Sequence, residues 1–177
     1  MDLKPVFILF TGFSGSGKTT LSNTLTSHYK NRRKKVVHLD GDYLRKTSHN
    51  QLGFSREDRR KQLLQTGELA LQHLNQGSHV IASLIAPYDL DRSDLKTYIN
   101  TKGFKFILIY IDCPIHICIQ RDPKGLYKKV SAGEIKNFTG IDAPYDIPKE
   151  PDLLVSTHIL DQTECISKII NANFISF

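Results

Sequence analysis

Residues 12–19 read Gly-Phe-Ser-Gly-Ser-Gly-Lys-Thr and fit the pattern G-x-x-x-x-G-K-[ST] without a mismatch. An apolar run, VFILF at residues 6–10, precedes this stretch, and a segment with apolar residues at a spacing of four follows it. Glycines let the backbone curl so that its N–H groups face inward, and the start of a following helix adds partial positive charge. The stretch therefore predicts a loop that holds a polyphosphate between a buried strand and a helix.

The pattern also assigns roles to its last two residues. Lys18 is expected to reach the β- and γ-phosphates of a nucleoside triphosphate, and the hydroxyl of Thr19 is expected to bind Mg²⁺. The residues expected to bind the nucleotide are Gly12, Phe13, Ser14, Gly15, Ser16, Gly17, Lys18, Thr19 and Thr20. A phosphate-binding loop does not identify the acceptor of the phosphate, because many chemistries use one.

Strand-like and helix-like segments alternate along the rest of the chain. Strands are predicted at residues 6–10, 35–39, 79–84, 104–111 and 153–155, and helices at 18–30, 55–76, 89–101, 114–121 and 162–172. This alternation predicts an α/β fold, a three-layer sandwich with a five-stranded, mainly parallel sheet, in one domain over residues 1–177. Residues 122–151 are too long for an ordinary connection, and their aromatic and apolar content favours an ordered lid.

Composition narrows the class of protein. Of the 177 residues, 40% are hydrophobic and 24% charged, which is typical of a globular domain. The sequence shows neither a secretory signal nor an apolar run near the roughly 20 residues that span a bilayer, so a cytoplasmic protein is expected. Three cysteines cannot all pair within one chain, which also favours a reducing compartment. Cys113 and Cys118 flank His116, but without further ligands burial is predicted for them rather than metal binding.

The charge balance indicates the kind of partner. Lys and Arg total 24 against 18 for Asp and Glu, a net charge of +6, which favours anions. Dense basic tracts and known nucleic-acid modules are not found in the sequence. A small phosphorylated ligand is therefore predicted, rather than a nucleic acid or a membrane.

Candidate acceptor-side residues follow the second predicted strand. Asp40 and Asp42 come at its carboxyl end, where the residues of a parallel sheet face the ligand crevice. A carboxylate there can order Mg²⁺ or take the proton of an attacking hydroxyl. The second role is predicted for Asp42, and Asp40 is expected to shape the turn or to support the water shell of the metal. Arg45 offers a planar fork of donors suited to phosphate or sulfate.

Further candidates lie around the long predicted helix and after the third strand. Phe54 precedes this helix and could be a core residue or a ligand contact, and Arg59 lies in its first turns. A cation is not favoured there by the helix dipole, so Arg59 indicates an anionic partner. Residues 85–88, Ile-Ala-Pro-Tyr, follow the third strand at the same crevice edge.

Two segments of the lid carry a family resemblance. Residues 121–129 read RDPKGLYKK, and residues 133–142 read GEIKNFTGID. Together with the phosphate loop and LGFS at residues 52–55, they resemble the adenylyl-sulfate (APS) kinases over nearly the whole chain. The resemblance implies a P-loop kinase with a mobile lid. Such a kinase transfers the γ-phosphate of ATP to the 3′-hydroxyl of adenosine 5′-phosphosulfate, a step of sulfate assimilation, with ATP and Mg²⁺ as cofactors.

The resemblance also implies roles for individual residues. Asp42 becomes a catalytic, magnesium-linked carboxylate, Arg45 and Arg59 contact the phosphosulfate, and Phe54 and Phe138 sandwich the adenine. The substrate-binding residues implied are Asp40, Arg45, Phe54, Arg59, Gln62, Ile85, Lys124, Gly125, Leu126 and Phe138. A homodimer and a functional link to a sulfurylase are implied as well.

Four residues depart from the family pattern. Tyr43 and Gln62 replace asparagine, Ala86 replaces serine, and Asp89 replaces a frequent arginine. All four lie on the acceptor side, whereas the phosphate loop is unchanged. Drift within the family is one interpretation, and a different acceptor, such as a cytidine-linked phosphoramidate, is another. A regulatory nucleotide switch is a third, although the N-K-x-D segment of a GTPase is missing from the sequence.

Overall fold

The computed structural model describes residues 4–48 and 51–175, and these form an α/β sandwich around one parallel sheet. Within them the strand order is β2-β3-β1-β4-β5, and every neighbouring pair is parallel. The strands are β1 (Val6–Thr11), β2 (Val36–Asp40), β3 (His79–Ser83), β4 (Lys105–Asp112) and β5 (Leu153–Ser156). The carboxyl ends of parallel strands meet at one edge, which gathers the loops that follow them.

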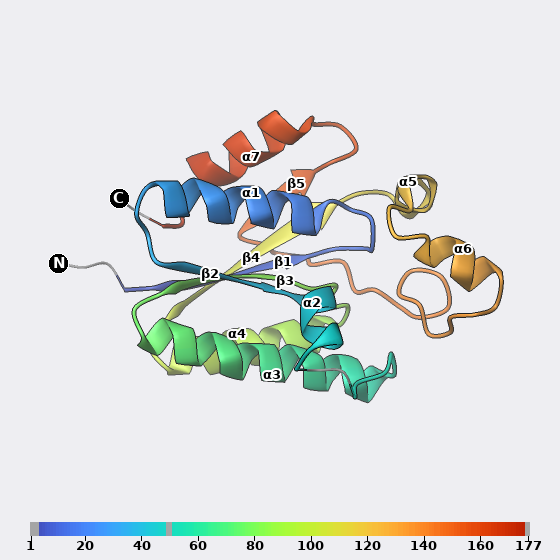
Figure 1. Cartoon of the computed structure of the whole chain (residues 1–177), viewed down its shortest axis with the longest axis horizontal. Helices are drawn as coiled ribbons and strands as arrows, with labels where there is room; N and C mark the ends of the chain where they lie inside the picture. The colour runs from blue at the N-terminus through green and yellow to red at the C-terminus, as the bar shows by residue number, and fades with distance from the viewer. Residues whose placement is uncertain (1–3, 49–50, 176–177) are drawn as a thin grey trace.

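Helices cover both faces of the sheet, as Figure 1 shows: α1 and α7 lie on one side, and α3 and α4 on the other. The helices are α1 (Lys18–Asn31), α2 (Gly41–Lys46), α3 (Arg56–Asn75), α4 (Asp89–Thr101), α5 (Ile115–Arg121), α6 (Leu126–Ser131) and α7 (Gln162–Asn171). Helices α5 and α6 project beyond the sheet at one end. Among the helices of the described ranges, none has the length and apolarity that a membrane crossing requires.

The core is divided by the central strand β1, in which all six residues are buried. Ile8 and Phe10 belong to the apolar cluster under α1 and α7, while Phe7 and Leu9 belong to the cluster with α3 and α4. Successive side chains of a strand point to opposite faces, so a continuous apolar run is what a strand covered on both faces requires.

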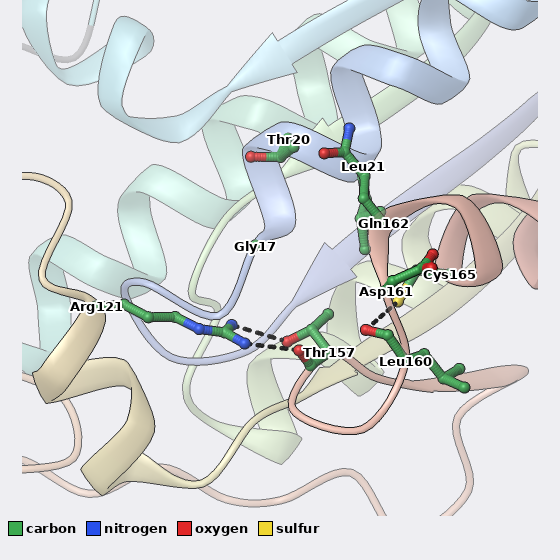
Figure 2. Close-up of a pocket in the computed structure, with 9 residues that line it drawn as sticks. All are labelled: Gly17, Thr20, Leu21, Arg121, Thr157, Leu160, Asp161, Gln162 and Cys165. Atoms are coloured by element: carbon green, nitrogen blue, oxygen red, sulfur yellow. Dashed lines mark hydrogen bonds between the residues drawn. The ribbon is translucent and has the colours of Figure 1, made fainter.

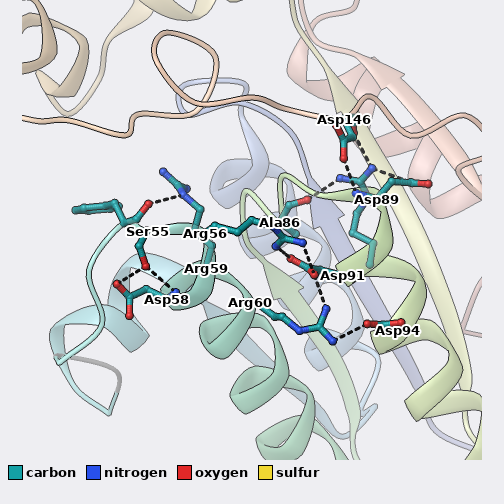
Figure 3. Close-up of polar contacts among 12 residues, drawn as sticks. Ser55, Arg56, Asp58, Arg59, Arg60, Ala86, Asp89, Asp91, Asp94 and Asp146 are labelled. Atoms are coloured by element: carbon teal, nitrogen blue, oxygen red, sulfur yellow. Dashed lines mark hydrogen bonds and ion pairs between the residues drawn. The ribbon is translucent and has the colours of Figure 1, made fainter.

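Ion pairs join α3 to α4 close to the crevice (Figure 3). The guanidinium groups of Arg56 and Arg60 both bind Asp91, whose side chain is only 3% exposed. Arg60 also binds Asp94 at 2.7 Å, and the guanidinium of Arg56 lies 3.7 Å from the ring centre of Tyr88. Removing both arginines would leave the buried carboxylate of Asp91 unpaired, which is costly. The network therefore fixes the start of α4 and the loop that leads into it.

The predicted strands and helices agree with the structure to within one residue at each end, and two short helices were missed. Helix α2 stands where a simple polar turn was expected, because the side chain of Asp40 accepts the N–H groups of Asp42 and Tyr43 and so caps the helix. Helix α6 lies inside the predicted lid, which packs against α5 and the phosphate loop in a third apolar cluster. Pro114 occupies the capping position before α5 rather than its first turn.

A matched pair of leucines on α4 tests the position of the core. Leu95 is fully buried, whereas Leu90 is 65% exposed. We expect Leu95→Ala to lower the free energy of unfolding by roughly 2–5 kcal/mol, because it leaves a cavity. Leu90→Ala is expected to change it by about 0.5 kcal/mol or less. Urea unfolding followed by circular dichroism measures both, and equal losses would contradict the assigned packing.

Candidate active site

The phosphate loop is built on left-handed glycines at the end of β1. Gly12, Gly15 and Gly17 have φ angles of 146°, 78° and 100°. A Cβ atom on Gly12 would lie 2.5 Å from the carbonyl oxygen of Ile111, so only glycine fits there. Helix α1 begins directly after Gly17, which brings its free N–H groups to the loop.

Lys18 is folded against the loop that it follows. Its Nζ donates to the carbonyl oxygens of Gly12 at 2.9 Å and Phe13 at 2.6 Å. Burial lowers the pKa of Lys18 from 10.5 to about 8, although the charge of Asp42 works in the opposite direction. The ammonium group is thus held at the loop by neutral acceptors, so an anion bound there would gain a strong partner.

Asp40 connects the phosphate loop to the neighbouring strands. Its Oδ2 accepts the hydroxyls of Thr19 and Ser83, each at 2.9 Å, while its Oδ1 accepts the N–H groups of Asp42 and Tyr43. Burial alone would raise the pKa of Asp40, but the hydrogen bonds from Tyr43, Thr19 and Ser83 outweigh it, and the pKa lies below its usual value. Asp40 is therefore a carboxylate with its acceptor capacity filled.

The hydrogen bond from Thr19 to Asp40 also affects how a metal ion can bind. Thr19 gives its hydroxyl proton to Asp40, which leaves the lone pairs of its oxygen for a cation. A hydroxyl backed by a carboxylate suits Mg²⁺, which takes oxygen ligands and keeps several waters. No cluster of three or more His, Cys, Asp or Glu that could hold a metal occurs in the described residues. These residues therefore fit a Mg²⁺ ion whose other ligands are water and phosphate.

Asp42 and Lys124, both predicted site residues, form an ion pair across the crevice. Asp42 lies in the first turn of α2 and Lys124 in the lid, and both side chains are about half exposed. Gly125 follows with φ 65° at the start of α6, and Leu126 packs in the apolar cluster of the lid. The lid therefore covers the carboxylate expected to act on the acceptor.

Arg45 and Arg59 bind backbone carbonyls rather than carboxylates. Arg45 donates to Gly53 at 2.6 Å, and Arg59 donates to the carbonyls of Phe54 at 3.0 Å and Asn137 at 2.6 Å. Burial lowers the pKa of both arginines, and the charge of Arg59 lowers that of Arg45 further. Neither forms an ion pair with a described residue. Two guanidinium groups close together, one buried and one partly buried and neither in an ion pair with a described residue, indicate a site for an anion.

The two predicted adenine-stacking rings have different surroundings. Phe54 is 44% exposed and lies beside the guanidinium of Arg45, 4.7 Å from its ring centre. Phe138 is 5% exposed, and its ring meets that of Tyr127 edge-on, with the centres 5.0 Å apart. The sandwich stays a prediction: one ring is accessible, and the other is packed in the lid.

The remaining predicted acceptor residues position backbone. Gln62 is buried, and its Nε2 donates to the carbonyl oxygen of Gly41 at 3.0 Å, which ties α3 to the start of α2. The carbonyl of Ile85 accepts the hydroxyl of Thr11, the last residue of β1, at 2.6 Å.

Asp89 and Ala86, two of the four residues that depart from the family pattern, are both bound by Arg92. Asp89, whose side chain is 60% exposed, binds the guanidinium of the buried Arg92 at 2.9 Å, so its charge is paired (Figure 3). The side chain of Arg92, 2% exposed, also donates to the carbonyl of Ala86 at 2.7 Å. Ala86 has a φ of 42°, a strained conformation for alanine, at the crevice edge. Tyr43, by contrast, is 67% exposed, and nothing in the structure explains this substitution.

Sequence reasoning missed a cavity of about 320 Å³ beside the phosphate loop (Figure 2). Arg121 donates to the carbonyl of Thr157 at 2.6 Å, and Thr157 donates to the carbonyl of Ser16 at 2.8 Å. Thr20, the one expected nucleotide contact beyond the motif, also lines this cavity. The signal was available: Thr157 directly follows β5, at the same edge of the sheet as the other candidates.

Sequence reasoning also missed the side-chain contacts that join the phosphate loop and the end of β1 to residues of the predicted lid. The ring of Tyr145 lies 4.7 Å from that of Phe13, and its hydroxyl is 2.9 Å from that of Thr11. Tyr127 donates its hydroxyl to the carbonyl of Ser14 at 2.9 Å. Contacts between segments so distant in sequence leave no pattern in the sequence.

Comparisons with known proteins find relatives over nearly the whole chain. The family model described as adenylylsulphate kinase matches residues 4–156. The adenylyl-sulfate kinase of Clostridium kluyveri is 39% identical over 166 residues, 94% of this chain and 82% of that protein. That of Staphylococcus haemolyticus is 41% identical over 94% of this chain and 83% of that protein. The structure of the Mycobacterium tuberculosis APS kinase in complex with AMPPNP and APS matches with a TM-score of 0.91 and 34% identity, over 96% of this chain and 97% of that one.

Two glycines with positive φ provide a matched test of the loop. Gly12→Ala would place a Cβ atom against a backbone oxygen, whereas Gly77, with φ 80°, has open space around it. We expect Gly77→Ala to cost about 1–2 kcal/mol of stability and to leave nucleotide affinity unchanged. Gly12→Ala should cost more and abolish binding of AMPPNP in calorimetry. Normal binding by Gly12→Ala would count against the assigned loop geometry.

The pKa of Lys18 predicts a pH dependence of stability without nucleotide. The folded chain loses this proton near pH 8 and the unfolded chain near pH 10.5, so between these values the unfolded state binds more protons and stability rises with pH. Relative to Lys18→Met, the free energy of unfolding of the wild type should increase by about 2 kcal/mol from pH 8 to pH 10. Urea titrations at several pH values measure the difference, and a constant difference would contradict the shift.

Proposed function

Because the chain belongs to the adenylylsulphate kinase family, we propose that it transfers the γ-phosphate of ATP to the 3′-hydroxyl of adenosine 5′-phosphosulfate. The observation that carries this proposal is the position of Asp42. The charge of its carboxylate acts both on Lys18 of the phosphate loop and on Arg45, one of the two arginines proposed for the acceptor. The match to an APS kinase in complex with AMPPNP and APS, over almost the whole chain, supports two nucleotides in this arrangement.

ATP would occupy the phosphate loop and the adjoining cavity. The loop supplies backbone N–H groups and the start of α1 for the phosphates. The cavity beside Gly17, bounded by Arg121 and Thr157, is the recess that adjoins the loop and is large enough for the base. Arginine beside such a recess can stack on the flat face of an adenine ring.

The hydroxyl of Thr19 would bind Mg²⁺, with Asp40 holding that hydroxyl and supporting the metal's water shell. Asp42 is also assigned to the metal side, since its carboxylate faces the same crevice as Lys18. When bound, the ion supplies neutralisation of the charge that develops on the phosphates.

The chain's own residues then position the reactants. Lys18 would leave the carbonyls of Gly12 and Phe13 for the phosphates. Asp42 would accept the proton of the 3′-hydroxyl at its carboxylate and orient that oxygen in line with the γ-phosphate. For this, Asp42 has to exchange its partner Lys124 for the hydroxyl, which frees the lid lysine to approach the phosphates. Closure of the lid would exclude water, the competing acceptor.

The acceptor would be held by its anionic end and by its base. Arg45 and Arg59 supply two guanidinium groups for the phosphosulfate, since neither is neutralised by a carboxylate in the described residues. Phe54 supplies an accessible ring for the adenine, and Phe138 would complete the sandwich. Base-aromatic stacking contributes roughly 1–3 kcal/mol for each ring. The lid residues Lys124, Gly125 and Leu126 would then close over both nucleotides.

The test of the function is turnover of ATP with a panel of acceptors. We expect rapid formation of ADP only when adenosine 5′-phosphosulfate is present, with a product that carries a new 3′-phosphate by mass spectrometry. Faster turnover with a cytidine-linked phosphoramidate would instead assign a different acceptor. Turnover that ignores every acceptor would favour a regulatory switch.

A single substitution separates chemistry from binding. We expect Asp42→Asn to lower kcat by about 10²–10⁴-fold, because the amide cannot take the proton, while AMPPNP affinity changes little. Asp94→Asn is the matched control, since Asp94 is an aspartate of α4 with a comparable exposed fraction. Wild-type kcat in Asp42→Asn, measured with both substrates saturating, would remove Asp42 from this role.

The proposal also covers the cellular location and the assembly of the protein. The three cysteines are free thiols and all buried, which fits a reducing compartment such as the cytoplasm. The homodimer and the link to a sulfurylase stay predictions from the family resemblance, and sedimentation of the pure protein tests the first.

A further inference from the structure

A half-buried histidine lies directly behind the carboxylate that supports the phosphate loop. His38 belongs to β2, two residues before Asp40. Its Nε2 lies 2.9 Å from the hydroxyl oxygen of Ser22 and 3.1 Å from that of Ser83. Ser22 comes from α1 and Ser83 from the end of β3, so one ring atom joins three elements that converge on the loop.

Each serine hydroxyl has one proton, and this decides which atom donates in each of these hydrogen bonds. The hydroxyl of Ser83 donates its one proton to Oδ2 of Asp40, and the hydroxyl of Ser22 donates its one proton to the carbonyl oxygen of Thr19 at 3.1 Å. Each hydroxyl can therefore only accept at the ring. It follows that Nε2 of His38 carries the hydrogen and shares it between the two serines.

We propose that His38 is a positioning residue for the phosphate loop: its Nε2–H turns the Ser83 hydroxyl toward Asp40 and thereby holds the Asp40 carboxylate against the hydroxyl of Thr19. If Nε2 accepted instead, the Ser83 proton would turn to the ring, and Asp40 would lose one of its four donors. The Ser22 proton would likewise leave the carbonyl of Thr19. His38 contacts no reacting atom, and its effect reaches the cation site through Ser83 and Asp40. The inference rests on the proposed function where it concerns Mg²⁺ and ATP.

The position of the proton is measurable in the wild-type chain without any nucleotide. Long-range ¹H–¹⁵N correlation spectra distinguish a ring protonated on Nε2 from one protonated on Nδ1. The spectrum of His38→Gln assigns the signal of His38 by its disappearance. We expect a proton on Nε2 at pH 7.5, and a His38 ring that carries its only proton on Nδ1 overturns the proposal.

The consequence is measurable by calorimetry with AMPPNP in the presence of Mg²⁺ and in EDTA. Loss of groups that orient a metal ligand from outside its shell typically weakens metal binding by about 10–100-fold. For His38→Leu, which removes the ring donor, we expect affinity about tenfold weaker with Mg²⁺ and unchanged in EDTA. His38→Gln keeps an N–H donor on a side chain of similar length and should stay within about threefold of the wild type.

A second histidine supplies the matched control. His79 is also partly buried, and its Nδ1 accepts the N–H of Val6 at 3.1 Å, at the amino end of the sheet. His79→Leu should leave AMPPNP affinity unchanged in both solutions, although it also removes a hydrogen bond of the fold. An equal loss in His79→Leu, or unchanged Mg²⁺-dependent affinity in His38→Leu, overturns the proposal. A wild type that binds no AMPPNP would contradict the proposed function instead, while the proton position still decides the role of His38.

Discussion

The carboxylate of Asp40 is the interaction on which the site depends. One oxygen accepts hydroxyls from the phosphate loop and from β3, and the other accepts two N–H groups of α2. The first pair fixes Thr19 of the phosphate loop, and the second pair creates the short helix that carries Asp42 and Arg45, the candidates for the acceptor side. One ionised group therefore sets the distance between the two halves of the site. Replacing it would loosen both halves, because a buried donor without an acceptor is costly.

The charges of the crevice are arranged for ligands that bring negative charge. Lys18 is folded back on neutral carbonyls, and Arg45 and Arg59 bind carbonyls as well. Burial lowers the pKa of all three, which means that the folded chain bears a cost for keeping them charged there. Elsewhere the fold pairs its cations: Arg56, Arg60 and Arg92 all bind carboxylates. The contrast separates a structural network on α3 and α4 from cations that stay available for an anion.

How far the sequence could predict this structure depends on the range of the interactions. The strands and long helices were predictable, because continuous apolar runs and four-residue spacings record burial locally. The phosphate loop was predictable, since its backbone geometry requires glycine. Helix α2 was not, because it depends on a cap at Asp40 that the same residues could have used for a turn. The cavity at Arg121 and Thr157 joins two segments 36 residues apart. The place of Thr157 directly after β5 indicates the edge of the sheet, but it does not indicate that Arg121 meets it there.

The same limit explains why the sequence could suggest candidate residues for the acceptor side but not their contacts. Arg59 was singled out as a cation where a helix dipole does not favour one. Its actual contacts, the carbonyls of Phe54 and Asn137, tie together the two segments that carry the candidate stacking rings. The lid is tied to the phosphate loop in a similar way. The ring of Tyr127 packs on Phe138, and its hydroxyl donates to the carbonyl of Ser14. The acceptor segment, the lid and the phosphate loop therefore cannot shift independently. A ligand that moves any one of them changes the contacts of the other two, so the two proposed substrate sites share one structural constraint.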